Sequence, residues 1–215
     1  MNVLICCEES QAVCKAFREK GHNAFSCDIQ RCSGGRPEWH IKASCLFLLR
    51  AHRYGYSVSF KTQDGNFHWS PYQWDLIIAH PPCTYLARSS SCNMYVNGEK
   101  DTQRYNKMLS ARQFFMEFYN LPGRVCIENP VPMKMAGLPG YTQTVQPYEF
   151  GDNYTKLTCL WLKNLPYLIP QTYARPGEKR NYAKSWCAVR SGSKYRSKTF
   201  TGIAQAMAQQ WQFDE

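Results

Sequence analysis

The sequence predicts an α/β fold of the Rossmann-like kind, with a mostly parallel central sheet and helices on both faces. The first observation is a strand, a helix and a strand at the start of the chain, over residues 2–7, 11–20 and 23–28. A strand–helix–strand unit of this length has parallel strands. The second observation is that further apolar strands are expected over residues 75–79 and 124–129, on either side of a helix over residues 102–119.

Local signals mark the ends of the first helix. Ser10 stands just before it and is expected to cap its N–H groups, and Gly21 follows it and is expected to end it. After the second strand, which ends on Asp28, comes a loop rich in glycine and proline. A short apolar segment over residues 43–49 then precedes the next stretch of chain.

Residues 50–74 are expected to form a β-hairpin insertion. Residues 54–62 and 66–70 read as two alternating strands, and the turn between them is Gln63-Asp64-Gly65. The segment carries many aromatic residues and few acids. Two interpretations therefore stay open: the hairpin contacts a nucleic acid, or it is a solvated hairpin.

The rest of the chain adds a loop, a strand and a helix. Residues 84–101 are polar, rich in serine and without periodicity, which is typical of a loop that closes over a site. A further strand is expected over residues 155–165. The tail, residues 197–211, repeats apolar side chains at helical spacing. No internal repeat is visible, and we expect one domain over residues 1–215 with little or no separate target-recognition domain.

Charge and cysteine content narrow the class of protein. The formal net charge of +10 indicates a polyanionic partner, with nucleic acid the first choice, although a basic protein without such a partner is the alternative. The eleven cysteines are odd in number and mostly sit inside apolar runs, as they do in a reducing cytoplasm. Neither a paired Cys-x2-Cys spacing nor a membrane-length apolar run is present. We expect a cytoplasmic protein without a metal.

Three polar residues come directly after expected strands. Asp28 ends the second strand, Cys83 follows the fourth after two prolines, and Glu128 lies at the end of the fifth before Asn129-Pro130. Each has an ordinary explanation: a helix cap, a buried thiol and a surface acid. In an open parallel sheet, however, ligands bind outside the carboxyl ends of the strands. The three residues together therefore indicate a functional site.

The motifs around these residues resemble those of DNA cytosine-5 methyltransferases. The resemblance rests on "AHPPCTYLA" at residues 79–87 and "IENP" at residues 127–130, and residues 3–28 look like the first cofactor segment of that family. Residues 146–170 and 196–211 are similar to the second half of a compact subfamily common in phage and bacterial genomes. The chain departs from the family in having no glycine before Gly21, and Lys42-Ala43 in place of a Gly-Asp pair.

This resemblance implies a mechanism with assigned residues. Cys83 would be the nucleophile on carbon 6 of cytosine, and Glu128 would act on the N3 edge of the base. S-adenosylmethionine would be the cofactor, with Asp28 on its ribose and the helix around Thr199 returning to its pocket. The other residues are expected to hold the cofactor, at Cys7, Glu8, Ser10 and His80, or to position the substrate, at Pro81, Pro82, Asn129 and Pro130.

DNA is the expected partner, held by basic residues. Residues 174–198 contain eight Lys or Arg against one Glu, interleaved with Tyr182, Trp186 and Tyr195. Basic groups bind phosphates and aromatic rings stack on bases, although a solvated loop is the alternative. The nucleic-acid contacts expected from sequence are Arg88, Arg190, Lys194 and Arg196. Arg88 and Arg196 are also candidates for activating the thiol, because a free cysteine is mostly protonated at neutral pH.

Access to the base adds one requirement, and two rival functions remain. Attack on carbon 6 needs an unstacked base, so a duplex would have to be flipped. One rival is the same chemistry on RNA or a free pyrimidine nucleotide. The other is a nucleic-acid-binding relative without catalytic activity.

Overall fold

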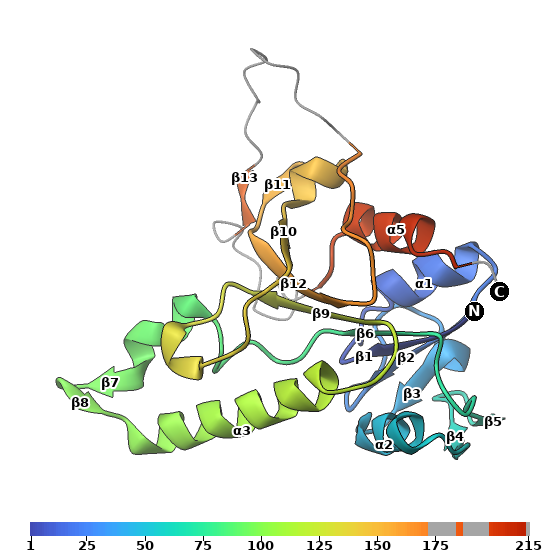
Figure 1. The fold of residues 1–215 in the computed structure, drawn as a ribbon, viewed down its shortest axis with the longest axis horizontal. Coiled ribbons are helices and arrows are strands. Elements are labelled where there is room, and N and C mark those ends of the chain that lie inside the picture. The colour runs from blue at the N-terminus through green and yellow to red at the C-terminus, as the bar shows by residue number, and fades with distance from the viewer. Residues whose placement is uncertain (172–183, 187–197, 214–215) are drawn as a thin grey trace, which may run out of the picture.

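A central seven-stranded sheet organises the chain, as a computed structural model describes it for residues 1–171, 184–186 and 198–213 (Figure 1). The strand order is β10-β12-β9-β6-β1-β2-β3. The strands are β1 (Asn2–Cys6), β2 (Asn23–Asp28), β3 (His40–Lys42), β6 (Leu76–Ala79), β9 (Val125–Pro130), β10 (Gln143–Val145) and β12 (Thr158–Lys163). The five strands from β3 to β9 run parallel, and β12 pairs antiparallel with both β9 and β10. The predicted α/β, Rossmann-like architecture is confirmed.

Helices cover both faces of this sheet. Side chains alternate along each strand, so Val3 and Ile5 pack on the face of α1 (Ala12–Glu19) and α5 (Thr201–Gln210). Leu4 and Cys6 point the other way, toward the layer of α2 (Leu46–Tyr54) and α3 (Thr102–Tyr119). Since both faces are buried, the inner strands read as continuous apolar runs rather than alternating ones.

The first strand–helix–strand unit forms as the sequence predicts, except at the start of its helix. β1 and β2 are parallel, and Gly21 takes a left-handed φ of 81° directly after the helix. Ser10, however, does not cap α1: the residue before the helix is Gln11, which also has a left-handed φ of 59°. Backbone N–H groups of the first turn donate instead to the carboxylate of Glu8.

The next part of the chain differs from the expectation. The third strand is β3, and the apolar segment after it starts α2, which runs on through Tyr54. The expected insertion therefore begins too early, because residues 50–54 belong to this helix. The reason is visible in the burial: Leu48, Leu49, Ala51 and His52 form one buried stripe against the sheet.

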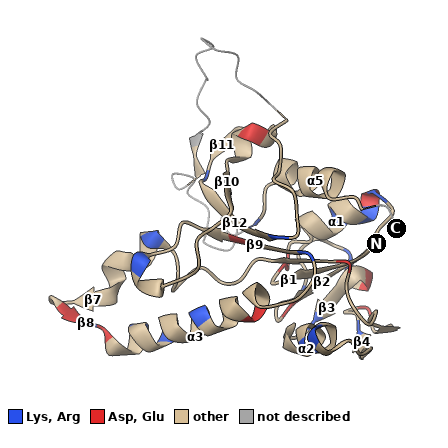
Figure 2. Cartoon of the chain, in the orientation of Figure 1, with Lys and Arg blue, Asp and Glu red and all other residues tan. Residues whose placement is uncertain are grey.

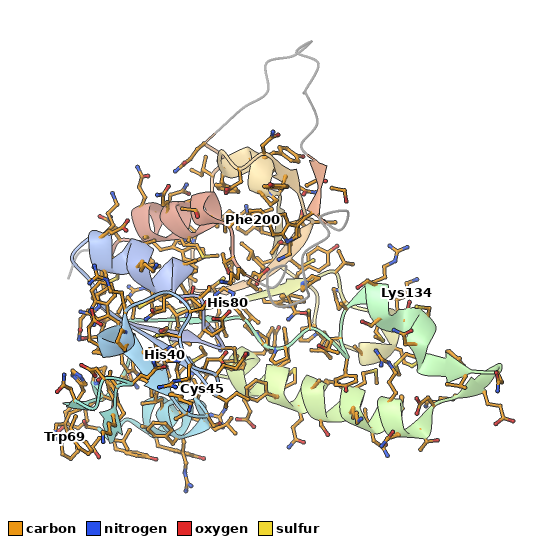
Figure 3. All side chains as sticks on the ribbon, turned by 180° about the vertical axis from the view of Figure 1, so that it is seen from behind. His40, Cys45, Trp69, His80, Lys134 and Phe200 are labelled. Carbon is orange, nitrogen blue, oxygen red and sulfur yellow. The ribbon has the colours of Figure 1, made fainter. Side chains whose placement is uncertain are left out.

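The hairpin itself is confirmed, and it is half buried. β4 (Ser59–Lys61) pairs antiparallel with β5 (Phe67–Trp69). On the inner face, Phe60 is 4% exposed and packs edge-on against Phe25 with ring centroids 5.1 Å apart. On the outer face, Phe67 and Trp69 are 75% and 74% exposed, and Trp69 lies at the edge of the molecule (Figure 3). The hairpin is therefore anchored in the core through one face.

The segment after Cys83 is folded rather than a plain loop. It forms η2 (Arg88–Met94) and the small hairpin of β7 (Tyr95–Val96) and β8 (Glu99–Lys100), and these lead into α3. Met94 is fully buried, and the backbone N–H of Arg88 donates to the carbonyl of Val131 over 2.7 Å. Together with η3 (Lys134–Ala136), these elements make an arm that projects past the carboxyl ends of β6 and β9 (Figure 1). We call residues 84–119 and 134–136 the arm.

The second half of the chain docks α5 against the sheet. η4 (Pro147–Phe150) ends next to this helix, and the Asp152 carboxylate accepts from the backbone N–H of Gly202 over 2.9 Å. A side chain at Gly202 would collide with the Phe150 carbonyl, so the close approach requires glycine. Beside them, the short strands β11 (Tyr154–Thr155) and β13 (Lys184–Ser185) pair in parallel.

Two expected absences concern the membrane and metals. Among the helices that the structure describes, none is long and apolar enough to cross a bilayer. The same part of the chain contains no group of three His, Cys, Asp or Glu side chains that could hold a metal ion.

The hairpin gives a matched test of the fold. We expect Phe60→Ala to lower the free energy of unfolding by about 3–5 kcal/mol, because it leaves a cavity among packed aromatic rings. Phe67→Ala, on the same hairpin but on the exposed face, should change it by less than about 0.5 kcal/mol. Denaturant unfolding of both variants measures the difference. Equal effects would contradict the anchoring of the hairpin in the core.

Candidate functional site

Strand register aligns three residues at the carboxyl edge of the sheet. Ala79, the last residue of β6, pairs with Cys6 on one side and with Ile127 on the other. The residues that follow are Cys7, His80 and Glu128, and they therefore stand in one row across three neighbouring strands. In this row, Cys7 and His80 line the cavity described next, whereas Glu128 lies beside it and is not part of its lining.

An open cavity of about 390 Å³ lies beside this row. Its walls bring together seven residues expected from the sequence, namely Cys7, Glu8, Ser10, Asp28, His80, Pro82 and Cys83. Sequence reasoning did not single out Glu9, Gln30 or Thr84 of this lining, although Glu9 lies between two residues expected to hold the cofactor, and it counted Lys198 only in the basic segment of residues 174–198. Thr199 also lines the cavity, in agreement with the expected return of the C-terminal segment.

The two prolines fix how the chain leaves β6. The N–H of His80 still donates to the carbonyl of Cys6 over 3.0 Å, and the sheet ladder then stops because proline has no N–H. The side-chain amide of Asn129 donates to the carbonyl of Pro81 over 2.7 Å. The backbone N–H groups of Leu86 and Ala87 both donate to the carbonyl of Cys83 over 2.9 Å. The thiol is therefore presented from a rigid turn.

The charge balance around Cys83 keeps it protonated. Burial raises the pKa of the thiol, the Glu128 carboxylate raises it further, and the Lys156 ammonium acts in the opposite direction. The cation that acts on this thiol is thus Lys156, on the segment between β11 and β12, which the strand pattern did not single out. Arg88 lies exposed on η2 and is not among the groups that shift this pKa. Arg196 lies outside the described residues.

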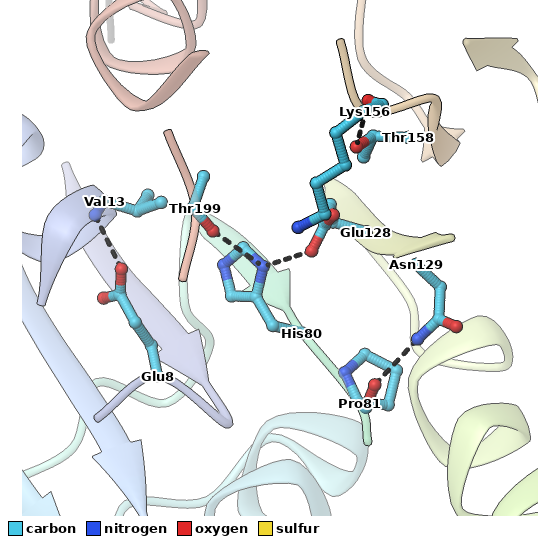
Figure 4. A network of polar contacts seen from close by, with 9 residues as sticks. All are labelled: Glu8, Val13, His80, Pro81, Glu128, Asn129, Lys156, Thr158 and Thr199. Carbon is cyan, nitrogen blue, oxygen red and sulfur yellow. Dashed lines mark hydrogen bonds and ion pairs between the residues drawn. The ribbon is translucent and has the colours of Figure 1, made fainter. Parts of the chain in front are cut away.

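Glu128 is buried and ionised. It is 8% exposed, and its Oε2 accepts from Nδ1 of His80 over 3.0 Å (Figure 4). Burial raises the pKa of this carboxyl, but the His80 hydrogen bond and the nearby Lys156 charge outweigh burial and leave the pKa below its usual value. The hydroxyl of Thr199 lies 3.4 Å from the same Nδ1. Figure 4 shows the imidazole ring between Glu8 and Glu128.

An internal carboxylate occupies the N-terminus of α1. The two oxygens of Glu8 accept from the backbone N–H groups of Val13 and Cys14 over 2.6 and 3.2 Å. These are the donors that would otherwise bind an anionic ligand. Although this turn contains no glycine, Cys7 and Gln11 adopt the left-handed backbone conformation, each with a φ of 59°. This turn therefore cannot present its helix N-terminus to a phosphate.

The remaining walls are also acidic. Asp28 is partly buried, its Oδ1 accepts from the N–H of Gln30 over 2.8 Å, and burial raises its pKa. Glu9 is buried, and its Oε2 has no hydrogen-bond partner among the residues described. At the open rim, the ammonium of Lys198 donates to the Ser33 hydroxyl over 3.1 Å. A buried oxygen without a partner in an acidic cavity favours a ligand that brings donors or a positive charge.

Several expected site residues lie elsewhere. Asn129 and Pro130 support the wall instead of lining the cavity: Asn129 holds the Pro81 carbonyl, and Pro130 pairs with Thr158 in the sheet. Arg190 and Lys194, with most of the basic segment, lie outside the described residues. Trp186, expected to stack on bases, is 7% exposed and packs edge-on against Tyr154 and Phe200 with ring centroids 4.6 and 4.7 Å away. That interpretation of Trp186 is wrong, because the ring completes an aromatic cluster.

The opposing charges near Cys83 predict opposite changes in its reactivity. Glu128→Gln removes a negative neighbour, so the pKa of Cys83 should fall and alkylation at fixed pH should accelerate. Lys156→Met removes the positive neighbour and should slow it, since below the pKa the thiolate fraction changes about tenfold for each unit of pKa.

Alkylation rates at pH 8 can be measured by mass spectrometry of the peptide that contains Cys83. Cys92, exposed on η2, is the internal control and should react at the same rate in all three proteins. The account of the thiol's surroundings would be wrong if both variants moved the Cys83 rate in one direction.

No protein-family model matches the sequence, and no curated protein matches it closely enough to count as a relative.

Proposed function

We propose that this chain is an S-adenosylmethionine-dependent methyltransferase that acts on carbon 5 of cytosine in DNA. The observation that carries the proposal is the row at the carboxyl edge of the sheet. This row includes the buried carboxylate of Glu128 on β9, and it adjoins a cavity lined by Cys83, from the turn after β6, and by Asp28 on β2. A nucleophile beside a carboxylate, next to a cofactor-sized cavity, is what covalent catalysis on a pyrimidine requires. The motifs of residues 79–87 and 127–130 point to the same chemistry.

The chemistry of the cavity suits this cofactor better than a dinucleotide. A pyrophosphate needs a free helix N-terminus, and Glu8 already fills that of α1. S-adenosylmethionine has no phosphate and carries a sulfonium and an ammonium group. The carboxylate of Glu9, one oxygen of which has no partner in the described part of the chain, suits such a cation. Asp28, at the end of β2, suits the ribose hydroxyls.

The residues can then be assigned to steps. Cys83, as a thiolate, adds to carbon 6 of the pyrimidine, which makes carbon 5 nucleophilic. A proton taken up from solvent as the base binds is shared between the Glu128 carboxylate and N3, and it stabilises the charge that develops in the ring. The cofactor, when bound, supplies the methyl group as an electrophile. Loss of the carbon-5 proton to a base and cleavage of the bond between sulfur and carbon 6 then release Cys83.

A polymer is favoured as the substrate over a free nucleotide. The arm next to Cys83 presents exposed basic side chains on several of its elements (Figure 2), at Arg88, Lys107, Arg112 and Lys134. The whole chain carries a net charge of +10. Cations of this kind contact phosphates and give an affinity that falls with salt. Within the described residues, the arm is therefore the surface that best suits the flanking strand, while the target base is turned out of the stack.

A mechanism-based trap tests the proposal. We expect an oligonucleotide with 5-fluorocytosine to become covalently joined to the wild-type protein when S-adenosylmethionine is present, because fluorine cannot leave as a proton does. Denaturing gel electrophoresis and mass spectrometry of the Cys83 peptide measure the adduct.

Matched variants separate the rival functions. Cys83→Ser should form no adduct and should lose methyl transfer by about a thousandfold or more, yet bind the oligonucleotide as wild type does. Cys92→Ser is the control and should behave as wild type. An adduct with RNA or a free nucleotide, but none with DNA, would move the proposal to that substrate. No adduct, no cofactor binding and retained DNA affinity would favour a non-catalytic DNA-binding protein.

A further inference from the structure

His80 stands between the two halves of the candidate site. It follows β6 in the row, lines the cavity, and its side chain is 8% exposed. On one side, its Nδ1 lies 3.0 Å from Oε2 of Glu128. On the other side lie the cavity and the buried Glu8 (Figure 4). The ring is therefore the one side chain in the row between the proposed base-binding and cofactor-binding groups.

The hydrogen bond to Glu128 sets which nitrogen of the ring carries a proton. The surroundings keep Glu128 ionised, so its oxygens can only accept. Nδ1 must then be the donor, and a neutral ring presents Nε2 as an acceptor. The same bond engages Oε2 and limits the rotation of the carboxyl group.

The second ring nitrogen has no partner. Nε2 of His80 is buried and makes no hydrogen bond to any residue that the structure describes. Buried polar atoms are nearly always satisfied in folded proteins, so such a nitrogen at a cavity wall calls for a ligand that donates to it. The neighbouring carboxylates of Glu8 and Glu9 favour a cationic donor, and the ammonium of an amino-acid group is one.

We propose that His80 is a positioning residue that couples cofactor binding to recognition of the base. A donor from the amino-acid part of the cofactor on Nε2 would hold the ring in the tautomer that donates from Nδ1 to Glu128. In return, a base engaged by Glu128 would favour that tautomer and strengthen cofactor binding. The coupling is reciprocal, as any coupling between two binding equilibria must be. This inference rests on the proposed function and adds to it that each ligand strengthens the binding of the other.

Two amide variants separate the two sides of the ring. His80→Asn places an amide near the position of Nδ1, so it can still donate to Glu128 but does not reach the cavity. His80→Gln places its amide near the position of Nε2, so it reaches the cavity but leaves Glu128 without its donor. Each variant therefore serves as the control for the other, and similar thermal unfolding of both would show that neither effect comes from lost folding.

Binding, rather than turnover, gives the test. S-adenosylhomocysteine is the cofactor probe, because it keeps the amino-acid group and cannot react. Its affinity is measured by calorimetry, with and without a saturating single-stranded oligonucleotide that contains cytosine. For wild type, we expect the oligonucleotide to strengthen probe binding by about fivefold or more, the usual range for coupled sites. Replacing the cytosine by thymine should remove this gain.

The variants should break the coupling from opposite sides. His80→Asn should weaken probe binding by about tenfold, the value of one hydrogen bond to a charged group, and leave oligonucleotide binding as in wild type. His80→Gln should weaken oligonucleotide binding and leave probe binding as in wild type. In both, the coupling factor should fall to about one.

Three outcomes would overturn the inference, and they are distinguishable. If wild type binds both ligands but either variant keeps the wild-type coupling, His80 is not the link. If His80→Asn leaves probe affinity unchanged, Nε2 does not contact the cofactor. If wild type does not bind S-adenosylhomocysteine at all, the proposed function fails, and the inference falls with it.

Discussion

The parallel pairing of β6 with β1 and β9 is the constraint on which the candidate site depends. Its register brings Cys7, His80 and Glu128 to one level, because Cys6, Ala79 and Ile127 are partners across the three strands. A slip of one residue would turn each of these side chains to the opposite face of the sheet. The slip is opposed by burial on both faces, since Leu76 and Ile78 pack under α1 and α5 while Ile77 and Ala79 pack toward α2 and α3. The apolar core therefore sets the geometry of the polar row.

Among the residues that the structure describes, the site combines several acids with few cations, namely Lys156 and Lys198. Each acid has a different environment: Glu8 is bound by the first turn of α1, Glu128 is held by His80, and Glu9 keeps an oxygen without a partner among the described residues. Burial and, after it, the carboxylate of Glu128 raise the pKa of the Cys83 thiol and keep it protonated, against the effect of Lys156. In the proposed reaction, a cationic cofactor and a proton shared between Glu128 and the bound base would both relieve the repulsion between Glu128 and a Cys83 thiolate. The thiol would thus be unreactive until both ligands are present, which limits side reactions.

The parts of the chain outside the row serve to hold it. η4 and Asp152 dock α5, and the segment before that helix brings Lys198 and Thr199 to the cavity. Trp186 and Phe200 complete the same region as an aromatic cluster. On the opposite side, the arm grows out of the turn that carries Cys83, so its basic surface is attached directly to the proposed nucleophile (Figure 2). Much of the resemblance in the second half of the chain therefore concerns packing rather than chemistry.

The sequence by itself determined the parallel sheet, the first strand–helix–strand unit, α3 and the placement of Asp28, Cys83 and Glu128 at the carboxyl edge of the sheet, because these depend on local patterns of apolar residues, glycine and proline. It did not determine that Glu8 rather than Ser10 caps α1, that α2 extends to Tyr54, or that residues 84–101 fold into the arm. Nor did it indicate Lys156 or the unpartnered nitrogen of His80. These features arise when side chains distant in sequence are buried together, and burial, hydrogen-bond partners and pKa shifts are properties of that tertiary arrangement alone.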